Sequence, residues 1–300
     1  MIKNSEMKTK SKKPRVIAVV GATASGKTDY AIKLASEVGG EIVSADSRLV
    51  YRGFDIVCAK PSIAEQSGIP HYMMDIVEPD YDYTAGLYVK DSKKIIYDIL
   101  SRGKTPIIVG GTGLYFRLLL ENYAPPGVKP DYVLRAKLQD MSNEDLYSML
   151  SDLDSEGVKS IELNDRKKLI RSIEIVKCSG KSLKEAKGIK ADTEFDVEWI
   201  GRNFPRDILY ERINNRVDFM LENGMIDETK RLLEKYGRIS NVTETIGYHE
   251  IIEYLDGYLP LDSAIDLLKQ NTRRYAKRQL TWFRKNKNIK WNCYPDILKK

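Results

Sequence analysis

The sequence predicts an α/β protein in which a parallel sheet is flanked by helices and interrupted by an inserted all-helical domain. Three short apolar runs have the composition of strands buried on both faces, and they cover residues 14–21, 41–47 and 105–113. Stretches with helical periodicity alternate with these runs, as expected for an open α/β sheet. Helical patterns without a convincing strand then occupy residues 125–193.

The first run, PRVIAVVG, ends in glycine and is followed by an amphipathic stretch that predicts a helix over residues 29–38. The second run ends near Asp46, and the third ends in the glycine-rich turn GGTG. Between them, apolar residues at helical spacing predict a helix over residues 85–100. Because ligands of open α/β sheets bind at the carboxyl ends of the strands, these ends are the expected site.

The segment APPGVKPDY carries three prolines and marks the start of the insertion. We expect a core domain from residues 1–124 and 194–300 and a helical insertion over residues 125–193. Residues 197–204 return to the composition of a strand. Further helices that would pack back on the sheet are predicted over residues 206–223, 226–236, 245–255 and 261–285.

The composition is that of a folded globular protein, with 42% hydrophobic and 31% charged residues in a chain of 300. Its three cysteines, Cys58, Cys178 and Cys293, have no spacing typical of a disulfide framework or a cysteine-rich zinc site. No apolar run approaches the roughly 20 residues that span a bilayer, and the polar N-terminal stretch lacks the apolar core of a signal peptide. We therefore expect a cytoplasmic monomer with no membrane partner.

The net charge of +6 is distributed unevenly along the chain. Residues 1–15 carry +5 and residues 273–300 carry +9, which leaves −8 on the residues between them. Basic ends on an acidic body are typical of contact with a polyanion, although a short basic leader more often only aids solubility. The C-terminal run interleaves its cations with aromatic residues, so it is compatible with nucleic-acid binding and with a helix packed on the core.

The strongest motif lies between the first predicted strand and its helix and matches G-x-x-x-x-G-K-[ST] in full. Its members are Gly21, Ala22, Thr23, Ala24, Ser25, Gly26, Lys27 and Thr28. This pattern in this context predicts a P-loop NTPase-like sheet whose backbone N–H groups hold phosphate oxygens at a helix N-terminus. Lys27 would add a positive charge, and the Thr28 hydroxyl would hold Mg²⁺.

Three uses of such a phosphate site compete: nucleotide hydrolysis, phosphoryl transfer, and binding of a diphosphate leaving group. A hydrolytic motor needs an apolar strand that ends in an acidic pair, and none is apparent. Asp46 alone follows the second strand, where it could act as a general base, a metal ligand or a structural cap. Candidates for further polar contacts are Thr112, Arg206, Arg212 and Arg216, while His71 and His249 have no partner at metal-ligand spacing.

Eight sequence blocks occur in the order typical of the tRNA dimethylallyltransferases, and the chain resembles this family from about residue 16 to residue 283. They are GATASGKT, SADSRLVYRGFDI, AKP, VGGTGLYFRLLL, NDRKKLIRSIEIV, RINNRVDFM, TIGYHE and TRRYAKRQLTWFR. The chain departs from the usual residues at four places, namely Ala22 for Pro, Leu49 for Gln, Val57-Cys58 for Gly-Thr and Tyr72 for His. The usual Gln lies beside the target base, so Leu49 bears on how that base is read.

The resemblance implies transfer of a dimethylallyl group from dimethylallyl diphosphate to N6 of the adenosine 3′-adjacent to the anticodon, in tRNAs that read codons beginning with U. It implies catalytic roles for Asp46 and Thr112, and diphosphate binding by the loop residues 21–28 with Arg206, Arg212 and Mg²⁺ at Thr28. The residues implied to contact the tRNA anticodon arm are Asp46, Ser47, Arg48, Leu49, Thr112, Arg135, Lys167, Lys168, Leu169, Ile170 and Arg171.

Three other functions remain open from the residues: an adenylate isopentenyltransferase that modifies free nucleotides, a small-molecule kinase, and a non-enzymatic nucleic-acid binder. The first shares the phosphate loop and the aspartate. The helical insertion and the basic, aromatic C-terminal run argue against it, because a mononucleotide acceptor requires neither.

Overall fold

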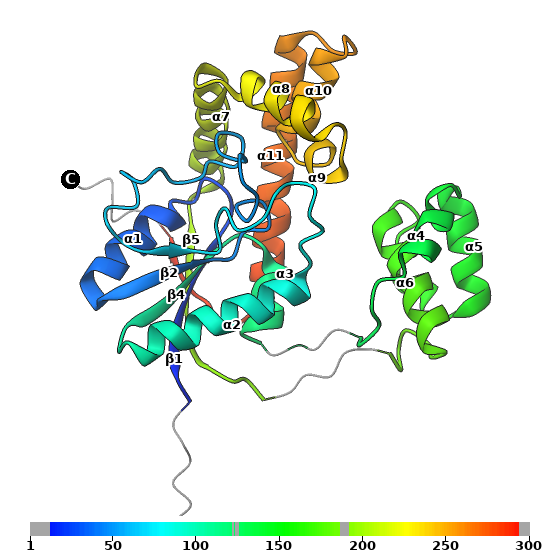
Figure 1. Cartoon of the computed structure of the whole chain (residues 1–300), viewed down its shortest axis with the longest axis horizontal. Helices are drawn as coiled ribbons and strands as arrows, with labels where there is room; N and C mark the ends of the chain where they lie inside the picture. Colours follow the sequence, from blue (N-terminus) through cyan, green and yellow to red (C-terminus); the bar gives the residue numbers. More distant parts are fainter. Residues whose placement is uncertain (1–12, 122, 124–125, 187–191, 294–300) are drawn as a thin grey trace, which may run out of the picture. The chain divides into compact units, whose positions relative to one another are not determined.

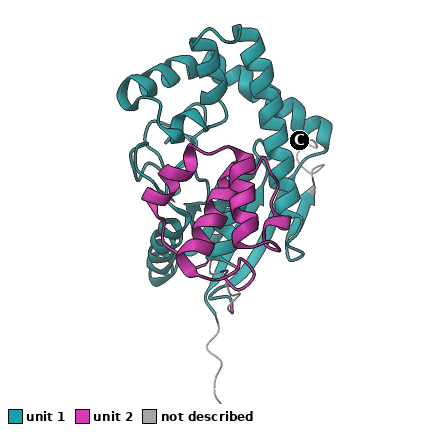
Figure 2. Cartoon of the chain, turned by 90° about the vertical axis from the view of Figure 1, so that its right-hand side faces the viewer, with its two compact units in different colours: residues 1–120, 193–300 teal, residues 121–192 magenta. Residues whose placement is uncertain are grey.

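The computed structural model describes residues 13–121, 123, 126–186 and 192–293. The chain divides into two compact units, one formed by residues 1–120 and 193–300 and the other by residues 121–192 (Figure 2). The second unit lies close to the limits of 125 and 193 expected from the sequence. The N-terminal basic run up to residue 12 lies outside the described residues.

The first unit is built on a six-stranded sheet in which all neighbouring strands are parallel, in the order β3-β2-β4-β1-β5-β6 (Figure 1). The strands are β1 (Arg15–Gly21), β2 (Gly40–Ser44), β3 (His71–Tyr72), β4 (Thr105–Gly110), β5 (Asp196–Asn203) and β6 (Lys290–Cys293). This confirms the predicted α/β class and the four predicted strands. The two edge strands β3 and β6 were not predicted, because one is only two residues long and the other lies within a basic run.

The strands bury both faces, which explains their nearly continuous apolar sequences. Alternate residues of β1 point to opposite sides: Ile17 and Val19 pack against α1 (Lys27–Val38), whereas Val16, Ala18 and Val20 belong to the larger core on the other face. The helices of that larger core include α2 (Ala85–Ser101) and the C-terminal helix α11 (Leu261–Phe283). The sheet is therefore a central layer between two layers of helices (Figure 1).

The remaining helices of the first unit are α2 (Ala85–Ser101), α3 (Gly113–Leu119), α7 (Arg206–Glu222), α8 (Met225–Tyr236), α9 (Ser240–Thr243), α10 (Tyr248–Leu255) and α11 (Leu261–Phe283). Five of them, α2, α7, α8, α10 and α11, correspond to the predicted segments apart from their ends, whereas the short α3 and α9 were given no predicted range. The single helix predicted over residues 245–255 is wrong at its start, because Gly247 has φ 105° and interrupts the helical path between α9 and α10. No helix in the described part of the chain is long and apolar enough to cross a membrane.

The regular secondary-structure elements that the structure describes in the second unit are all helices, as the sequence predicts. It contains α4 (Tyr132–Gln139), α5 (Asn143–Leu153), the short 3₁₀ helix η1 (Val158–Ser160) and α6 (Arg166–Ser179). Its separate apolar core includes Leu138, Leu146, Leu150, Leu169 and Ile173. A unit with its own core folds around its own contacts.

Candidate functional site

The phosphate-binding motif forms the turn between β1 and α1. Gly26 adopts a left-handed conformation with φ 68° and precedes the first helical residue, Lys27, so the helix begins two residues earlier than the predicted 29. No side chain caps this helix N-terminus. The backbone N–H groups of the first turn are therefore available to an anion, and the helix dipole favours negative charge there.

The side chain of Lys27 points back toward the start of the motif, and its Nζ donates a hydrogen bond to the carbonyl oxygen of Ala22 at 3.2 Å. Burial of the ammonium group lowers its pKa from 10.5 to about 8, although the negative charge of Asp46 opposes this shift. The Arg216 guanidinium lowers the pKa further. Lys27 is thus a desolvated cation that a bound diphosphate would stabilise in its charged form.

Asp46 follows β2 and lies at the same edge of the sheet as the phosphate loop. Its Oδ1 accepts a hydrogen bond from the backbone N–H of Arg48 at 2.9 Å, which holds the carboxylate in a local turn. The next three residues, Ser47, Arg48 and Leu49, line the same cavity as Asp46. The structure therefore brings together all four members of the predicted segment 46–49.

Thr112 supports this segment instead of lining the cavity. Its Oγ1 accepts a hydrogen bond from the Ser47 N–H at 3.0 Å, and its own N–H donates to the carbonyl oxygen of Ala45 at 3.1 Å. The strand before it needs a glycine, because a Cβ on Gly110 would lie 2.1 Å from the Ala45 oxygen. Through these two hydrogen bonds Thr112 anchors the backbone on both sides of Asp46.

A cavity of about 430 Å³ joins the phosphate loop to Asp46. Thr23, Lys27 and Thr28 provide one polar side, and Asp46 provides a carboxylate. Apolar side chains also line the cavity, and six of them, here called the apolar wall, are Val57, Ile213, Val217, Met220, Ile246 and Leu268. A cavity with a phosphate cradle, one carboxylate and an apolar wall suits a phosphorylated hydrocarbon and a group that loses a proton.

A second hollow of about 1060 Å³ lies against the other side of the phosphate loop, along Ala24 to Asp29. The two hollows share six lining residues, namely Lys27, Thr28, Ala59, Pro61, Arg216 and Met220. The phosphate loop is thus accessible from two directions.

The structure brings two of the three candidate arginines of α7 to this loop. Arg212 donates from Nε to the Ala24 carbonyl oxygen at 2.9 Å, and Arg216 lies 3.5 Å from the Thr23 hydroxyl. Arg206 instead stacks over the ring of Tyr210 and lines a different hollow with Lys277. The structure thus places Arg212 and Arg216, one helical turn apart, at the phosphate loop, and it places Arg206 beside a different hollow.

The C-terminal helix α11 contributes residues that sequence reasoning did not assign to the site. The buried amide of Gln279 accepts from the Thr23 N–H at 2.9 Å and donates to the Gly111 carbonyl oxygen at 3.1 Å. Thr272, Tyr275 and Arg278 line the cavity from the same helix. The block TRRYAKRQLTWFR was the available signal, but its spacing alone did not separate core packing from ligand contact.

His71, for which the sequence shows no partner at metal-ligand spacing, also lines the cavity. Its Nδ1 lies 2.7 Å from the Ile69 carbonyl oxygen, so Nδ1 carries the proton and Nε2 is an acceptor. Burial lowers the pKa of this imidazole and favours its neutral form.

In the helical unit, the structure corrects part of the implied tRNA surface. The side chains of Leu169 and Ile170 are buried in the core of this unit, so they do not form a contact surface. Arg135 and Arg171 both pair with the carboxylate of Glu174, whose side chain is fully buried. Lys167 and Lys168 are exposed, and they remain as the candidates for phosphate contact.

The ion pairs of Arg135 and Arg171 with the buried Glu174 carboxylate stabilise the helical unit itself. Burial alone would raise the pKa of the Glu174 carboxyl group, but the two guanidinium groups outweigh burial and hold that pKa below its ordinary value. Its Oε1 also accepts from the Asp131 N–H at 2.6 Å, which ties the start of α4 to α6.

The donor set beside the phosphate loop fits Mg²⁺. The described residues contain no cluster of three or more His, Cys, Asp or Glu side chains able to hold a metal. Mg²⁺ is usually bound by one or two protein oxygens together with substrate phosphates and waters, and Thr28 and Asp46 offer oxygen ligands at one cavity. These residues suit an ion that arrives with a diphosphate.

The fold and the cavity define an α/β protein of the P-loop class whose phosphate site faces a carboxylate and an apolar wall. Residues 49–286 match the IPP transferase family, and residues 14–75 match the isopentenyl transferase family. The chain belongs to the IPP transferase family.

Individual relatives agree with this assignment. The chain is 42% identical to a tRNA dimethylallyltransferase of Pelotomaculum thermopropionicum, in an alignment that covers 95% of this chain and 92% of the relative. The crystal structure of the tRNA isopentenylpyrophosphate transferase from Bacillus halodurans is similar with a TM-score of 0.71 at 38% identity, covering 94% of this chain and 90% of that chain. A eukaryotic dimethylallyltransferase acting on tRNA is similar with a TM-score of 0.81 at 28% identity, covering 95% and 75% of the two chains.

Proposed function

We propose that this protein transfers a dimethylallyl group from dimethylallyl diphosphate to N6 of the adenosine 3′-adjacent to the anticodon, in tRNAs that read codons beginning with U. One observation carries the proposal: a phosphate loop, a carboxylate and an apolar wall line a single cavity of about 430 Å³. The names of the relatives support tRNA as the acceptor. The protein acts as a cytoplasmic monomer.

The phosphate loop binds the diphosphate of the donor. Backbone N–H groups at the start of α1, the Lys27 ammonium and the guanidinium groups of Arg212 and Arg216 face this group. They stabilise the negative charge that grows on the leaving oxygen as the bond to carbon lengthens. Mg²⁺ held at Thr28, when bound, would neutralise part of the same charge.

Asp46 accepts the proton that the amine loses. The N6 lone pair of adenosine is delocalised into the purine, so the amine is a weak nucleophile and gains from a positioned base. N6 forms a bond to C1 of the dimethylallyl group while the C1–O bond breaks, and the electron pair leaves with the diphosphate. The N6 proton passes to the Asp46 carboxylate, which its own turn and Thr112 hold at the cavity.

The acceptor base must leave its stack in the anticodon loop to reach this cavity. Residues 46–49 line the cavity and include Arg48 and Leu49, which offer a charged group and an apolar surface to a base. Leu49 offers no hydrogen bond from its side chain, so base selection at this position depends on shape and neighbouring backbone groups.

Mass spectrometry of tRNA nucleosides tests the proposal. Unmodified tRNA is incubated with the protein, Mg²⁺ and dimethylallyl diphosphate, and in parallel free AMP replaces the tRNA. We expect N6-dimethylallyladenosine in the tRNA digest only. Prenylated AMP without prenylated tRNA would favour an adenylate isopentenyltransferase, and phosphate transfer from ATP to an acceptor would favour a kinase.

A further inference from the structure

The apolar wall of the catalytic cavity includes Val57, which is also part of the main apolar core and is only 8% exposed. We propose that Val57, held by the buried carboxylate of Glu228, limits the size of the hydrocarbon group that the cavity accepts. The inference rests on the proposed function, because it concerns the donor of the same site. Glu228 itself does not line the cavity and is a positioning residue.

The side chain of Val57 packs against the turn that precedes α10. Gly247 in this turn lines the cavity beside Val57, and a Cβ built on Gly247 would lie 2.3 Å from Val57 Cγ1. Even a single added carbon atom at Gly247 would clash with Val57, so no part of a ligand fits between these two residues. The valine side chain therefore marks the end of the free volume in this direction.

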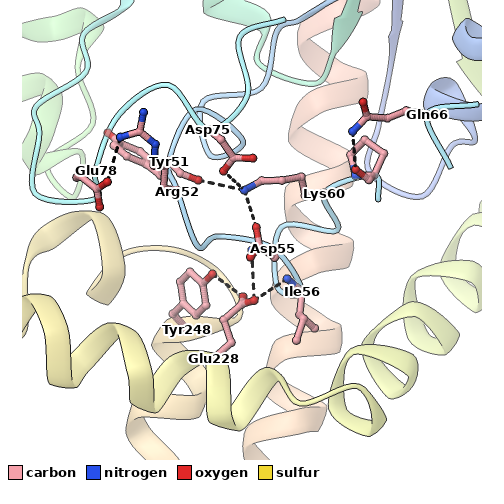
Figure 3. Close-up of polar contacts among 11 residues, drawn as sticks. Tyr51, Arg52, Asp55, Ile56, Lys60, Gln66, Asp75, Glu78, Glu228 and Tyr248 are labelled. Carbon is pink, nitrogen blue, oxygen red and sulfur yellow. Dashed lines mark hydrogen bonds and ion pairs between the residues drawn. The ribbon is translucent and has the colours of Figure 1, made fainter. Parts of the chain in front are cut away.

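Glu228 fixes the backbone that carries Val57 (Figure 3). Its Oε2 accepts from the N–H groups of Asp55 at 3.2 Å and Ile56 at 2.7 Å. Its Oε1 accepts from the Val57 N–H at 3.1 Å and from the Tyr248 hydroxyl at 2.7 Å. Four donors converge on one carboxylate that is 2% exposed, and an ionised carboxylate is suited to them because it only accepts.

A second set of contacts holds the other end of this segment. Lys60 donates to the carboxylate of Asp55 at 2.6 Å and pairs with Asp75, and it also lies 3.3 Å from the Tyr51 carbonyl oxygen (Figure 3). The segment 55–60 is thus anchored from α8 on one side and from its own loop on the other. Val57 lies between these anchors, so it has little freedom to move away from a larger ligand.

The test compares two donors, dimethylallyl diphosphate with five carbons and geranyl diphosphate with ten, on one tRNA substrate. In Val57→Ala, the loss of two methyl groups should raise kcat/KM for the ten-carbon donor relative to the five-carbon donor by about tenfold or more. Val242→Ala is the matched control, because Val242 is a fully buried valine of the same core that does not line the cavity. Its selectivity should equal that of the wild type.

Glu228→Gln tests the positioning role separately. The amide keeps the size of the side chain but replaces one accepting oxygen with a donor, so the segment loses part of its anchoring. We expect a raised KM for dimethylallyl diphosphate, an unchanged KM for tRNA, and a shift in selectivity toward the larger donor. Tyr248→Phe removes one of the four donors and should shift selectivity less. A purely structural role of Glu228 would lower only the active fraction, which reduces kcat and leaves selectivity unchanged.

Wild-type donor selectivity in Val57→Ala would overturn the proposal, whatever the result for Glu228→Gln. Selectivity that shifts in Val57→Ala but stays unchanged in Glu228→Gln would overturn the role of Glu228. Failure of the proposed function has a different signature, since the wild type would then transfer no prenyl group to tRNA from either donor.

Discussion

We predict that Lys27 makes donor binding dependent on pH, because its pKa of about 8 lies within a pH range that experiments can reach. In the proposed function the diphosphate binds the charged ammonium, and this charge is lost as the pH rises through 8. The dissociation constant for dimethylallyl diphosphate should therefore rise by about tenfold from pH 7 to pH 9. Calorimetric titration without tRNA measures this value.

Lys27→Arg is the matched variant, since arginine stays charged over this range. Its donor affinity should be nearly constant from pH 7 to pH 9. A wild-type affinity that does not change with pH would show that the Lys27 ammonium does not contribute to binding.

Asp46→Asn should separate chemistry from binding. The amide keeps the hydrogen bond that Arg48 donates, but it no longer accepts a proton from the attacking amine. We expect kcat to fall by about 10²- to 10⁴-fold while tRNA affinity changes little. Single-turnover kinetics with a filter-binding measurement of tRNA affinity checks both values, and near-normal turnover would exclude Asp46 as the base.

At the scale of secondary-structure elements, the phosphate loop depends on α11. Gln279→Leu preserves side-chain size but leaves the Thr23 N–H and the Gly111 carbonyl group without their partner. We expect a loss of about 2 kcal/mol in the free energy of unfolding and a weaker affinity for dimethylallyl diphosphate. Urea unfolding and calorimetric titration measure the two effects.

Gln270→Leu serves as the control, because Gln270 is exposed on the same helix. It should change neither the free energy of unfolding nor donor affinity by a measurable amount. Equal behaviour of the two variants would mean that the Gln279 amide does not hold the loop.

Helices α4 and α6 depend on the ion pairs of Glu174. Arg135→Ala removes two hydrogen bonds to this buried carboxylate and should destabilise the helical unit by about 2 kcal/mol, whereas Lys137→Ala on the exposed face of α4 should not. Because the pKa of Glu174 is lowered in the folded state, its stabilisation is present above the pKa of the unfolded chain and is lost as the pH falls through the folded value.

Hydrogen–deuterium exchange over residues 126–186 measures the stability of this unit within the full chain. Arg135→Ala should speed exchange there at neutral pH. In the wild type, acid should lower the protection factors, which are the intrinsic exchange rates at each pH divided by the observed rates. Exchange that is unchanged in Arg135→Ala would contradict a structural role for the pair.

At the scale of the whole molecule, the proposed phosphate contacts of tRNA and the proposed donor site belong to different units, so acceptor and donor binding should be separable. Lys167 and Lys168 are exposed on the helical unit, whereas the phosphate loop and Asp46 belong to the other unit. The double change Lys167→Glu and Lys168→Glu should weaken tRNA binding, reduce its salt dependence by about 0.7 to 0.9 per lost phosphate contact, and leave donor affinity intact.

Lys181→Glu with Lys184→Glu is the charge-matched control, since both lysines are exposed on the same unit. It should affect tRNA binding less. Arg171 is left unchanged in both variants. A substitution of Arg171 would break its ion pair with Glu174, and a loss of tRNA affinity could then result from a loss of stability. Unchanged tRNA affinity and salt slope in the first variant would remove Lys167 and Lys168 from the recognition surface.

Much of this organisation follows from local sequence. The strand pattern, the helical insertion and the phosphate loop could all be predicted, because each is encoded by consecutive residues whose backbone preferences act locally. The positions of the arginines on α7 also follow from helix geometry. Arg216 lies four positions after Arg212, so the two side chains share one face of the helix. Arg212 lies six positions after Arg206, which corresponds to a rotation of about 240° around the helix axis.

Only the tertiary structure decided which distant groups meet. Gln279 reaches the phosphate loop from 256 residues away, and Glu228 holds a segment more than 170 residues before it. The burial of Leu169 and Ile170 is likewise set by the packing of α6 against its neighbours, although a motif places them among tRNA contacts. Such contacts arise because side chains far apart in sequence share one packed core, and no local preference specifies their partner.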